Sequence, residues 1–253
     1  MKQTRFFRKR SVLKKQLLRK RSVLKKRFLL LTLVVFSVQY ITAQRVAHVT
    51  YQASKHYNEK VEEFENLPAI QSTDIVMLGN SLTEFGGDWC EKLGRDNVVN
   101  RGIIGDTSTG IYHRLCQILP SKPKAIFLLC GTNDVSHNLT PQQVFERCCQ
   151  VIAKIRRDSP QTKLFVQSLV PINESFGRWK LLEGKTNHIP AINKLLKAYC
   201  KRKGITYINL FPHFTEKGTN VLRKDYTTDG IHFSDEGYKV WSSVLAPYVE
   251  TIK

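Results

Sequence analysis

A serine, an aspartate and a histidine stand in short turn-like segments of the chain, together with a glycine and an asparagine. The segments are GNSLTE with Ser81, NRGIIGDTS with Gly105, GTND with Asn133, and DGIH with Asp229 and His232. These residue types provide a nucleophile, a carboxylate, a base and hydrogen-bond donors, which is the set that acyl transfer requires. Each segment alone is typical of an ordinary turn, so the prediction rests on their combination.

A serine hydroxyl is a weak nucleophile until an imidazole takes its proton, and that imidazole needs a partner on its other nitrogen. Asp229 precedes His232 by three residues, so its carboxylate can hold Nδ1 and leave Nε2 facing Ser81. A developing oxyanion needs donors, for which we predict the backbone N–H groups of Ser81 and Gly105 and the side-chain amide of Asn133. Gly105 has no side chain to obstruct the approach of a substrate.

There are two alternatives to Ser81 in this role, a second serine and the nucleophile elbow of an α/β-hydrolase. Ser108, in GDTSTG, lies near the same loops, but its position predicts that it caps the following helix. The G-x-S-x-G elbow of α/β-hydrolases requires a second glycine, and the chain has Thr83 there. Ser81 therefore remains the predicted nucleophile.

The chain alternates apolar, strand-like runs with stretches of helical length. Strands are predicted at 75–80, 98–103, 125–131, 163–171 and 206–211, and helices near 84–94, 108–119, 141–158, 187–203 and 235–251. Continuous apolar runs are typical of parallel strands buried on both faces. The pattern predicts an α/β fold, a three-layer α/β/α sandwich with a flavodoxin-like, five-stranded parallel sheet.

The predicted sheet brings the reactive residues together. Ligands bind beyond the carboxyl ends of parallel strands, where the loops after Asn80, Ile103, Gly131 and Pro171 would meet.

Helix starts are predicted at two places in the chain. Thr140 before Pro141 makes one N-cap, and Ser234 makes another.

Charge is concentrated at the amino terminus. The net charge is +19, of which +13 lies in residues 1–27, and an uncharged apolar run and a small residue, Ala43, follow. This order is typical of a secretory signal peptide cleaved after Ala43, so we expect export to the periplasm or beyond, with one domain at 44–253. An uncleaved membrane anchor is the alternative, whereas the apolar run argues against a nucleic-acid-binding arm.

The six cysteines all lie after residue 43, where oxidation to disulfides is permitted but not needed for a domain of this size. They form no C-x-x-C pair and no cluster with histidine, so no metal is predicted. Most are expected to be small buried hydrophobic residues, and adjacent Cys148 and Cys149 point in different directions on a helix.

The four segments resemble, in order, the signature blocks of the SGNH hydrolases, also called GDSL-type esterases and lipases, over residues 72–250. The resemblance implies ester hydrolysis through an acyl-enzyme without a cofactor. It places the nucleophile on Ser81, the oxyanion donors on Gly105 and Asn133, and the other triad members on Asp229 and His232. The chain departs from the family pattern at Asn80, where the family's name has aspartate.

Among family members, the chain is similar to exported single-domain bacterial enzymes that remove small acyl groups, often acetyl from sugars, and to platelet-activating-factor acetylhydrolases. The expected substrate is thus a small-molecule or glycan ester. Side chains that could contact it are Asn80, Phe85, Trp89, Phe176 and Trp179, although the aromatic ones could equally be packing residues. A lysophospholipase or thioesterase of the same fold, and a non-catalytic glycan-binding module, are the alternatives.

Overall fold

The computed structural model describes residues 53–253, so the predicted signal peptide lies outside the described residues. Five strands form one sheet in the order β2-β1-β3-β4-β5, and every pair is parallel. The strands are β1 (Ile75–Gly79), β2 (Val98–Gly102), β3 (Ala125–Leu128), β4 (Lys163–Gln167) and β5 (Thr206–Ile208). The predicted parallel five-stranded α/β fold is confirmed.

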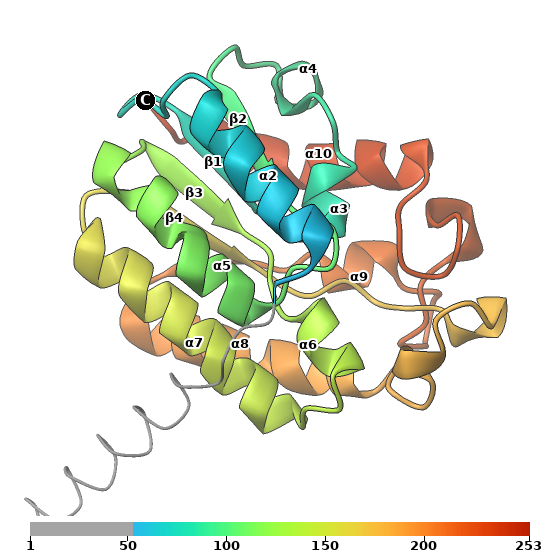
Figure 1. The fold of residues 1–253 in the computed structure, drawn as a ribbon. Coiled ribbons are helices and arrows are strands. Elements are labelled where there is room, and N and C mark those ends of the chain that lie inside the picture. Colours follow the sequence, from blue (N-terminus) through green and yellow to red (C-terminus); the bar gives the residue numbers. More distant parts are fainter. Residues whose placement is uncertain (1–52) are drawn as a thin grey trace, which may run out of the picture. The chain divides into compact units, whose positions relative to one another are not determined.

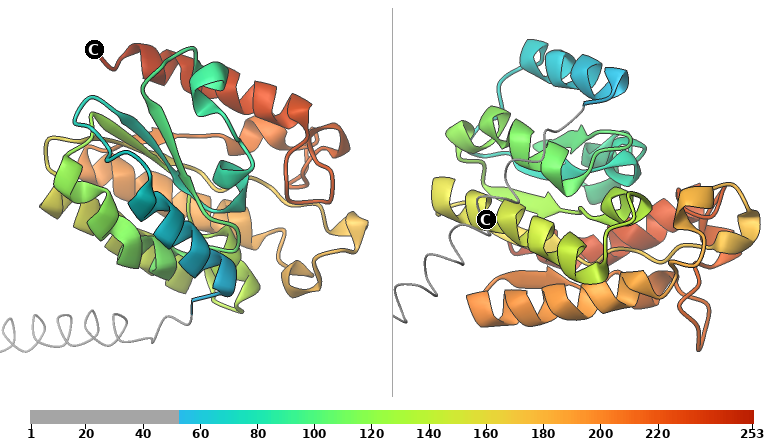
Figure 2. Two further views of the ribbon diagram at one scale, coloured as in Figure 1. Left: turned by 45° about the horizontal axis from the view of Figure 1, so that its top comes forward. Right: turned by 60° about the horizontal axis from the view of Figure 1, so that its bottom comes forward.

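Helices cover both faces of the sheet (Figures 1 and 2). On one face lie α5 (Ser108–Arg114), α7 (Pro141–Asp158) and α8 (His188–Lys203). On the other lie α4 (Trp89–Leu93) and α10 (Asp235–Glu250). Shorter helices at the edges are α3 (Ser81–Glu84), α6 (Thr132–Ser136) and α9 (Phe211–Phe214). The sequence did not predict α2 (Lys55–Asn66), which a hydrogen bond from Tyr57 to the carbonyl of Gly110 joins to α5.

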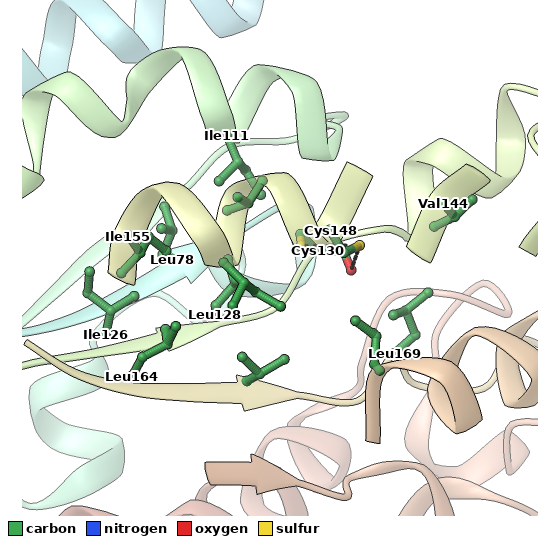
Figure 3. Close-up of a cluster of buried hydrophobic side chains, with 14 of the residues drawn as sticks. Leu78, Ile111, Ile126, Leu128, Cys130, Val144, Cys148, Ile155, Leu164 and Leu169 are labelled. Carbon is green, nitrogen blue, oxygen red and sulfur yellow. Dashed lines mark hydrogen bonds between the residues drawn. The ribbon is translucent and has the colours of Figure 1, made fainter. Parts of the chain in front are cut away.

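The core divides into two layers because neighbouring residues of a strand point to opposite faces. In β1, Val76 and Leu78 join the cluster under α5, α7 and α8, whereas Ile75 and Met77 join the cluster under α10. Figure 3 shows the first cluster, in which Leu78 lies among side chains of β3 and α7. Burial on both faces explains why the strand sequences are continuously apolar.

The cysteines only partly follow their prediction. Cys130, Cys148 and Cys200 are buried, Cys90 and Cys149 are half-buried, and Cys116 is exposed. The Sγ atoms of Cys130 and Cys148 lie 3.6 Å apart, as two thiols (Figure 3). Contact with Cys130, together with burial, raises the pKa of the Cys148 thiol well above its usual range.

Several predicted elements are shorter than expected. The helix predicted near 84–94 is two helices, α3 and α4, separated by the Gly86–Gly87 pair. The strand predicted to reach 171 ends at Gln167, because the side chain of Asn193 takes both the N–H and the C=O of Leu169 in place of a neighbouring strand. The helix predicted to reach 119 continues after Arg114 only as 3₁₀ turns.

Two predicted N-caps are confirmed and a third is wrong. Thr140 forms a capping box with Gln143, and Ser234 accepts a hydrogen bond from the N–H of Gly237. The cap of α5 is Thr107 and not Ser108, which is the first residue of that helix. Within residues 53–253, no helix combines the length and the apolar character needed to cross a membrane.

Candidate active site

The four segments singled out in the sequence meet at the carboxyl edge of the sheet. Ser81 begins α3 directly after β1, Gly105 follows β2, and Asn133 lies in α6 after β3. Asp229 and His232 come from the turn before α10, and the hydrogen bond between His232 and Ser81 joins residues 151 positions apart. The topology thus brings together all five predicted residues.

Ser81, His232 and Asp229 form a continuous hydrogen-bonded chain. The Nε2 atom of His232 lies 3.0 Å from Oγ of Ser81, and its Nδ1 atom lies 2.7 Å from Oδ2 of Asp229. Ser81 and Asp229 are buried, and the imidazole is partly open to two cavities. In this arrangement the imidazole can accept the proton of Ser81 on the nitrogen that faces it.

The carboxylate of Asp229 is held by its own turn. Its Oδ1 atom accepts hydrogen bonds from the N–H groups of Ile231 and His232, at 3.0 and 2.9 Å, which leaves Oδ2 for the imidazole. Burial opposes ionisation, but these bonds outweigh it and hold the pKa of Asp229 below its ordinary value. The ionised carboxylate fixes the proton of His232 on Nδ1, so Nε2 is the free base.

Three donors surround the space in front of Ser81. The N–H of Ser81 is the first of α3 and has no partner within that helix. Gly105 has a φ of +76°, in the left-handed region that favours glycine, and a Cβ there would meet no atom within 4 Å. One hydrogen of the Asn133 amide is donated to the carbonyl of Asp106, 2.8 Å away, so the second is available to a substrate.

Asn80, the departure from the family pattern, caps the helix of the nucleophile. Its Oδ1 atom accepts a hydrogen bond from the N–H of Leu82, at 3.1 Å, and its side chain is buried. An aspartate could accept the same bond, so the asparagine preserves the cap while it places no charge beside Ser81. Asn80 also lines the cavity that contains Ser81.

Glu84, at the end of α3, links the helix that begins with Ser81 to the loop that contains Gly105. Its carboxylate accepts a hydrogen bond from the N–H of Ile104, the residue before Gly105, and lies 3.1 Å from Nε2 of His56 in α2. The α3 backbone approaches β2 so closely at Gly102 that any Cβ there would collide with it. Sequence reasoning missed this role, although Glu84 belongs to the segment that contains Ser81.

A buried ion pair between Arg114 and Asp106 stabilises the loops that follow β1 and β2. Arg114 donates to Asp106 at 2.8 Å, and also to the carbonyl groups of Gly79 and Arg101 at the ends of β1 and β2. Burial raises the pKa of Asp106 to about 6, against the lowering effect of Arg114. The guanidinium of Arg114 thus links the ends of β1 and β2 to Asp106. The backbone carbonyl of Asp106 in turn orients the side chain of Asn133.

A second buried carboxylate, Asp134, joins α6 to α5. It accepts hydrogen bonds from the N–H and the hydroxyl of Ser108, at 2.8 and 2.6 Å. Burial raises the pKa of Asp134, while its bonds to Ser108 favour the charged form. The hydroxyl of Ser108 donates to Asp134 and not to His232, so Ser108 has a structural role and is not the nucleophile. Asp106 and Asp134 lie within the motifs GDTS and GTND, but residue type alone does not separate a supporting acid from a reactive one.

Comparison with known proteins identifies the family of the chain. Residues 76–240 match the model of the GDSL-like lipase/acylhydrolase family. The chain belongs to that family. Membership makes it a hydrolase of the esterase or lipase type.

Solved structures of the same fold extend the likeness over most of the chain. A proposed acylhydrolase of Bacteroides fragilis superimposes with a TM-score of 0.69 at 20% identity, covering 80% of this chain and 100% of that one. A GDSL-like lipase of Bacteroides thetaiotaomicron gives 0.67 at 23% identity, with coverages of 77% and 97%.

A curated relative is larger than this acylhydrolase. An N-acylneuraminate cytidylyltransferase of Escherichia coli is 26% identical over 202 residues, which are 76% of this chain and 43% of the relative. The chain thus spans less than half the length of that protein.

Aromatic side chains of this acylhydrolase flank the imidazole. The rings of Phe85 and Trp179 meet His232 edge to face, with centroids 5.0 and 5.4 Å away, and their side chains are 50% and 38% exposed. Trp89 is different, and the expectation that it contacts substrate is wrong. It is 1% exposed, donates its Nε1–H to the carbonyl of Thr83 and packs on Trp241 in the core.

His232 lines two cavities. The smaller, of about 410 Å³, contains Ser81, Asn80, Gly105 and Asn133. The larger, of about 1030 Å³, is bounded by α4, α10 and the ring of Phe85. Phe176 lines neither, although 39% of it is exposed. Within residues 53–253, no group of three His, Cys, Asp or Glu side chains is placed to hold a metal ion.

Proposed function

We propose that the protein is a serine esterase that removes small acyl groups, acetyl foremost, from carbohydrate or other small esters through an acyl-enzyme on Ser81. The observation that carries this proposal is the hydrogen-bonded chain from Asp229 through His232 to Ser81, which ends in a cavity with three oxyanion donors. The same intact chain argues against a non-catalytic glycan-binding module.

In the first half of the reaction, Oγ of Ser81 attacks the ester carbonyl carbon while Nε2 of His232 takes the hydroxyl proton. The carbonyl oxygen becomes an oxyanion that accepts hydrogen bonds from the N–H groups of Ser81 and Gly105 and the amide of Asn133. The intermediate then collapses. The imidazolium gives its proton to the departing alcohol, and the acyl group remains on Ser81.

In the second half, His232 removes a proton from water, which attacks the acyl carbon through a second oxyanion. Its collapse releases the carboxylic acid, and the proton returns to Oγ of Ser81. Asp229 stays ionised throughout, since its low pKa keeps the proton on Nδ1 of the imidazole.

The volume of the smaller cavity supports a small acyl group. About 410 Å³ is in the lower part of the range of ligand sites, and Asn80, Thr132 and Ser136 add polar groups to a lining that is otherwise mostly apolar. The competing candidate, a lysophospholipase or thioesterase, is favoured by exposed apolar side chains near the mouth, of which Leu181 is one. Acyl chain length therefore distinguishes the two.

Export is part of the proposal and rests on the composition of residues 1–43, with an uncleaved signal as the only membrane contact and no nucleic-acid partner. The cytidylyltransferase activity of the longer relative is not extended to this chain, which spans 43% of that protein.

The test compares the wild type with Ser81→Ala on p-nitrophenyl esters of increasing acyl length, with acetylated glycans and lysophospholipid as further substrates. We expect a loss of at least about 10⁴-fold in kcat for Ser81→Ala. Ser243→Ala, on the exposed face of α10, is the matched control and should keep full activity. Full activity in Ser81→Ala would overturn the mechanism. A strong preference for long acyl chains would instead favour the lysophospholipase or thioesterase.

A further inference from the structure

The segment between β4 and α8 overhangs the catalytic centre. Residues 173–187 project beyond the carboxyl edge of the sheet, in yellow to orange in Figure 1, and contain two 3₁₀ turns, Glu174–Phe176 and Lys180–Leu182. Between these turns, Trp179 lies edge-on to the imidazole of His232. The residues next to Trp179 in the sequence therefore lie near the catalytic imidazole of His232.

The segment is held in shape by the carboxylate of Glu174. It accepts hydrogen bonds from the N–H groups of Gly184 and Thr186, at 2.6 and 2.8 Å, and from the hydroxyl of Thr186. The N–H of Asn173 donates to the carbonyl of Gly230, 2.8 Å away, in the turn that contains the triad's carboxylate. The hydrogen bonds of Glu174 thus stabilise the fold of this segment, and the bond from Asn173 connects it to the turn that contains Asp229.

Two cations of this segment face the cavity that contains the nucleophile. Arg178 lines both cavities, and its guanidinium carbon lies 5.6 Å from the ring of Trp179. Lys180 lines the smaller cavity. Neither forms an ion pair with any residue between 53 and 253. Their charges are therefore available to a bound molecule.

The acidic residues near the site line other spaces. Asp229, Glu91 and Asp235 line the larger cavity, and Glu174 and Glu183 line a small space of about 110 Å³, which Lys180 also lines. Among the described residues that line the 410 Å³ cavity there is no Asp or Glu. Apart from His232, the charged side chains that line that cavity are Arg178 and Lys180, whereas the larger cavity has charges of both signs.

We propose that the ester hydrolysed at this site carries an anionic group, a carboxylate or a phosphate, which Arg178 and Lys180 hold in the cavity that contains Ser81. The inference rests on the proposed function and names its substrate class. The guanidinium of Arg178, within cation–π distance of the Trp179 ring, presents a fork of N–H donors that matches the oxygens of such a group. Lys180 adds a second positive charge on the same side.

The experiment measures kcat/KM for acetate release from 3-acetoxybenzoate and from its methyl ester, in which a methyl group replaces the negative charge. The ratio of the two values is compared between the wild type and Arg178→Gln, Lys180→Gln and the double variant. We expect this ratio to fall about 10-fold in Arg178→Gln and further in the double variant. 3-Acetoxyphenyl phosphate, measured against phenyl acetate, shows whether a phosphate is held in the same way.

Two control variants keep the result interpretable. Arg202→Gln removes a positive charge at the carboxyl end of α8, at the opposite edge of the sheet, and should leave the ratio unchanged. Arg178→Lys keeps the charge but loses the fork of donors, so its ratio should lie between those of the wild type and Arg178→Gln. Raising the NaCl concentration should lower the ratio in the wild type and not in the double variant.

The outcome that overturns the inference is an unchanged ratio, for carboxylate and phosphate alike, in a folded double variant that still hydrolyses the methyl ester. That result leaves the proposed function intact. Undiminished hydrolysis of both esters by Ser81→Ala would instead remove the proposed function itself, so the two failures are distinguishable.

Discussion

The carboxyl edge of the sheet and the segment 173–187 both contribute to the site, but they are built differently. At the sheet edge, the reactive groups stand on loops that leave β1, β2 and β3 directly. Buried charged side chains, above all Asp106 with Arg114, join these loops to one another. The overhanging segment exposes Trp179 and Leu181 and is closed chiefly by one carboxylate, that of Glu174.

The difference separates two tasks of an esterase. Oxyanion donors must already be in place when charge develops, and a buried network keeps them there. Substrate selection tolerates more movement, and it is commonly carried by loops on the surface of a rigid scaffold. Substitutions at the sheet edge should therefore affect folding and kcat, whereas those in the segment should affect KM and substrate preference.

Two tryptophans give the largest contrast. Trp89→Ala should lower the free energy of unfolding by about 3–5 kcal/mol, because it leaves a cavity in the core beside Trp241. Trp179→Ala should lower it by less than about 1 kcal/mol and raise KM, because its side chain is partly exposed beside the catalytic imidazole. Urea unfolding and steady-state kinetics measure both effects. Equal losses of unfolding free energy in the two variants would contradict the proposed contrast between a buried framework and the exposed segment 173–187.

Asn133 tests the sheet edge by kinetics. Asn133→Ala removes one of three oxyanion donors and should lower kcat by about 10²- to 10³-fold with little change in KM. Asn66→Ala, on the exposed end of α2, is the matched control and should change neither. A raised KM with an unchanged kcat would show that Asn133 binds the ground state and does not stabilise the oxyanion.

Glu174 tests the segment by its pH dependence and should give the smallest effect. Burial raises its pKa, but hydrogen bonds from Thr186 and from the backbone of Gly184 and Lys185 outweigh that effect and lower it. A lowered pKa in the folded state means that the carboxylate stabilises the fold above its unfolded pKa of about 4.3, and that this is lost as pH falls through the folded value.

Glu174→Gln should therefore cost about 1 kcal/mol of unfolding free energy at pH 7, after allowance for solvent exposure, and progressively less below pH 4. Thermal unfolding from pH 7 to pH 3 measures the difference. Glu183→Gln, on the same segment with an exposed side chain, serves as the control. A difference that stays constant down to pH 3 would exclude the carboxylate's charge as its cause.

Most of the fold could be predicted because its signals are local. Apolar runs place the five strands, and Thr140 and Ser234 mark helix starts. The strand ends could not be placed, because they depend on distant partners. One example is the Asn193 side chain, which replaces a strand at Leu169. Helix α2 was missed although Ser54 caps it, and its place beside α5 depends on distant contacts such as the hydrogen bond from Tyr57 to the carbonyl of Gly110.

The reactive residues were predictable for a different reason, since acyl transfer demands specific residue types in order along the chain. The supporting residues Glu84 and Arg114 were not, because a charged side chain shows its role only when its buried partners are known. Aromatic residues were the least predictable. Trp89 and Trp179 have the same type and similar sequence surroundings, but one lies in the core and the other over the imidazole.

The span of the Ser81–His232 hydrogen bond has a consequence for the folding of the chain. It closes a loop of 151 residues, so it brings together the first strand of the sheet and the turn before the last helix. Contacts of such high sequence separation carry a large loop-closure entropy and form slowly. The catalytic centre is thus absent from any nascent or partly folded chain that has not yet docked α10. Ester hydrolysis during refolding would report the final long-range assembly of the domain.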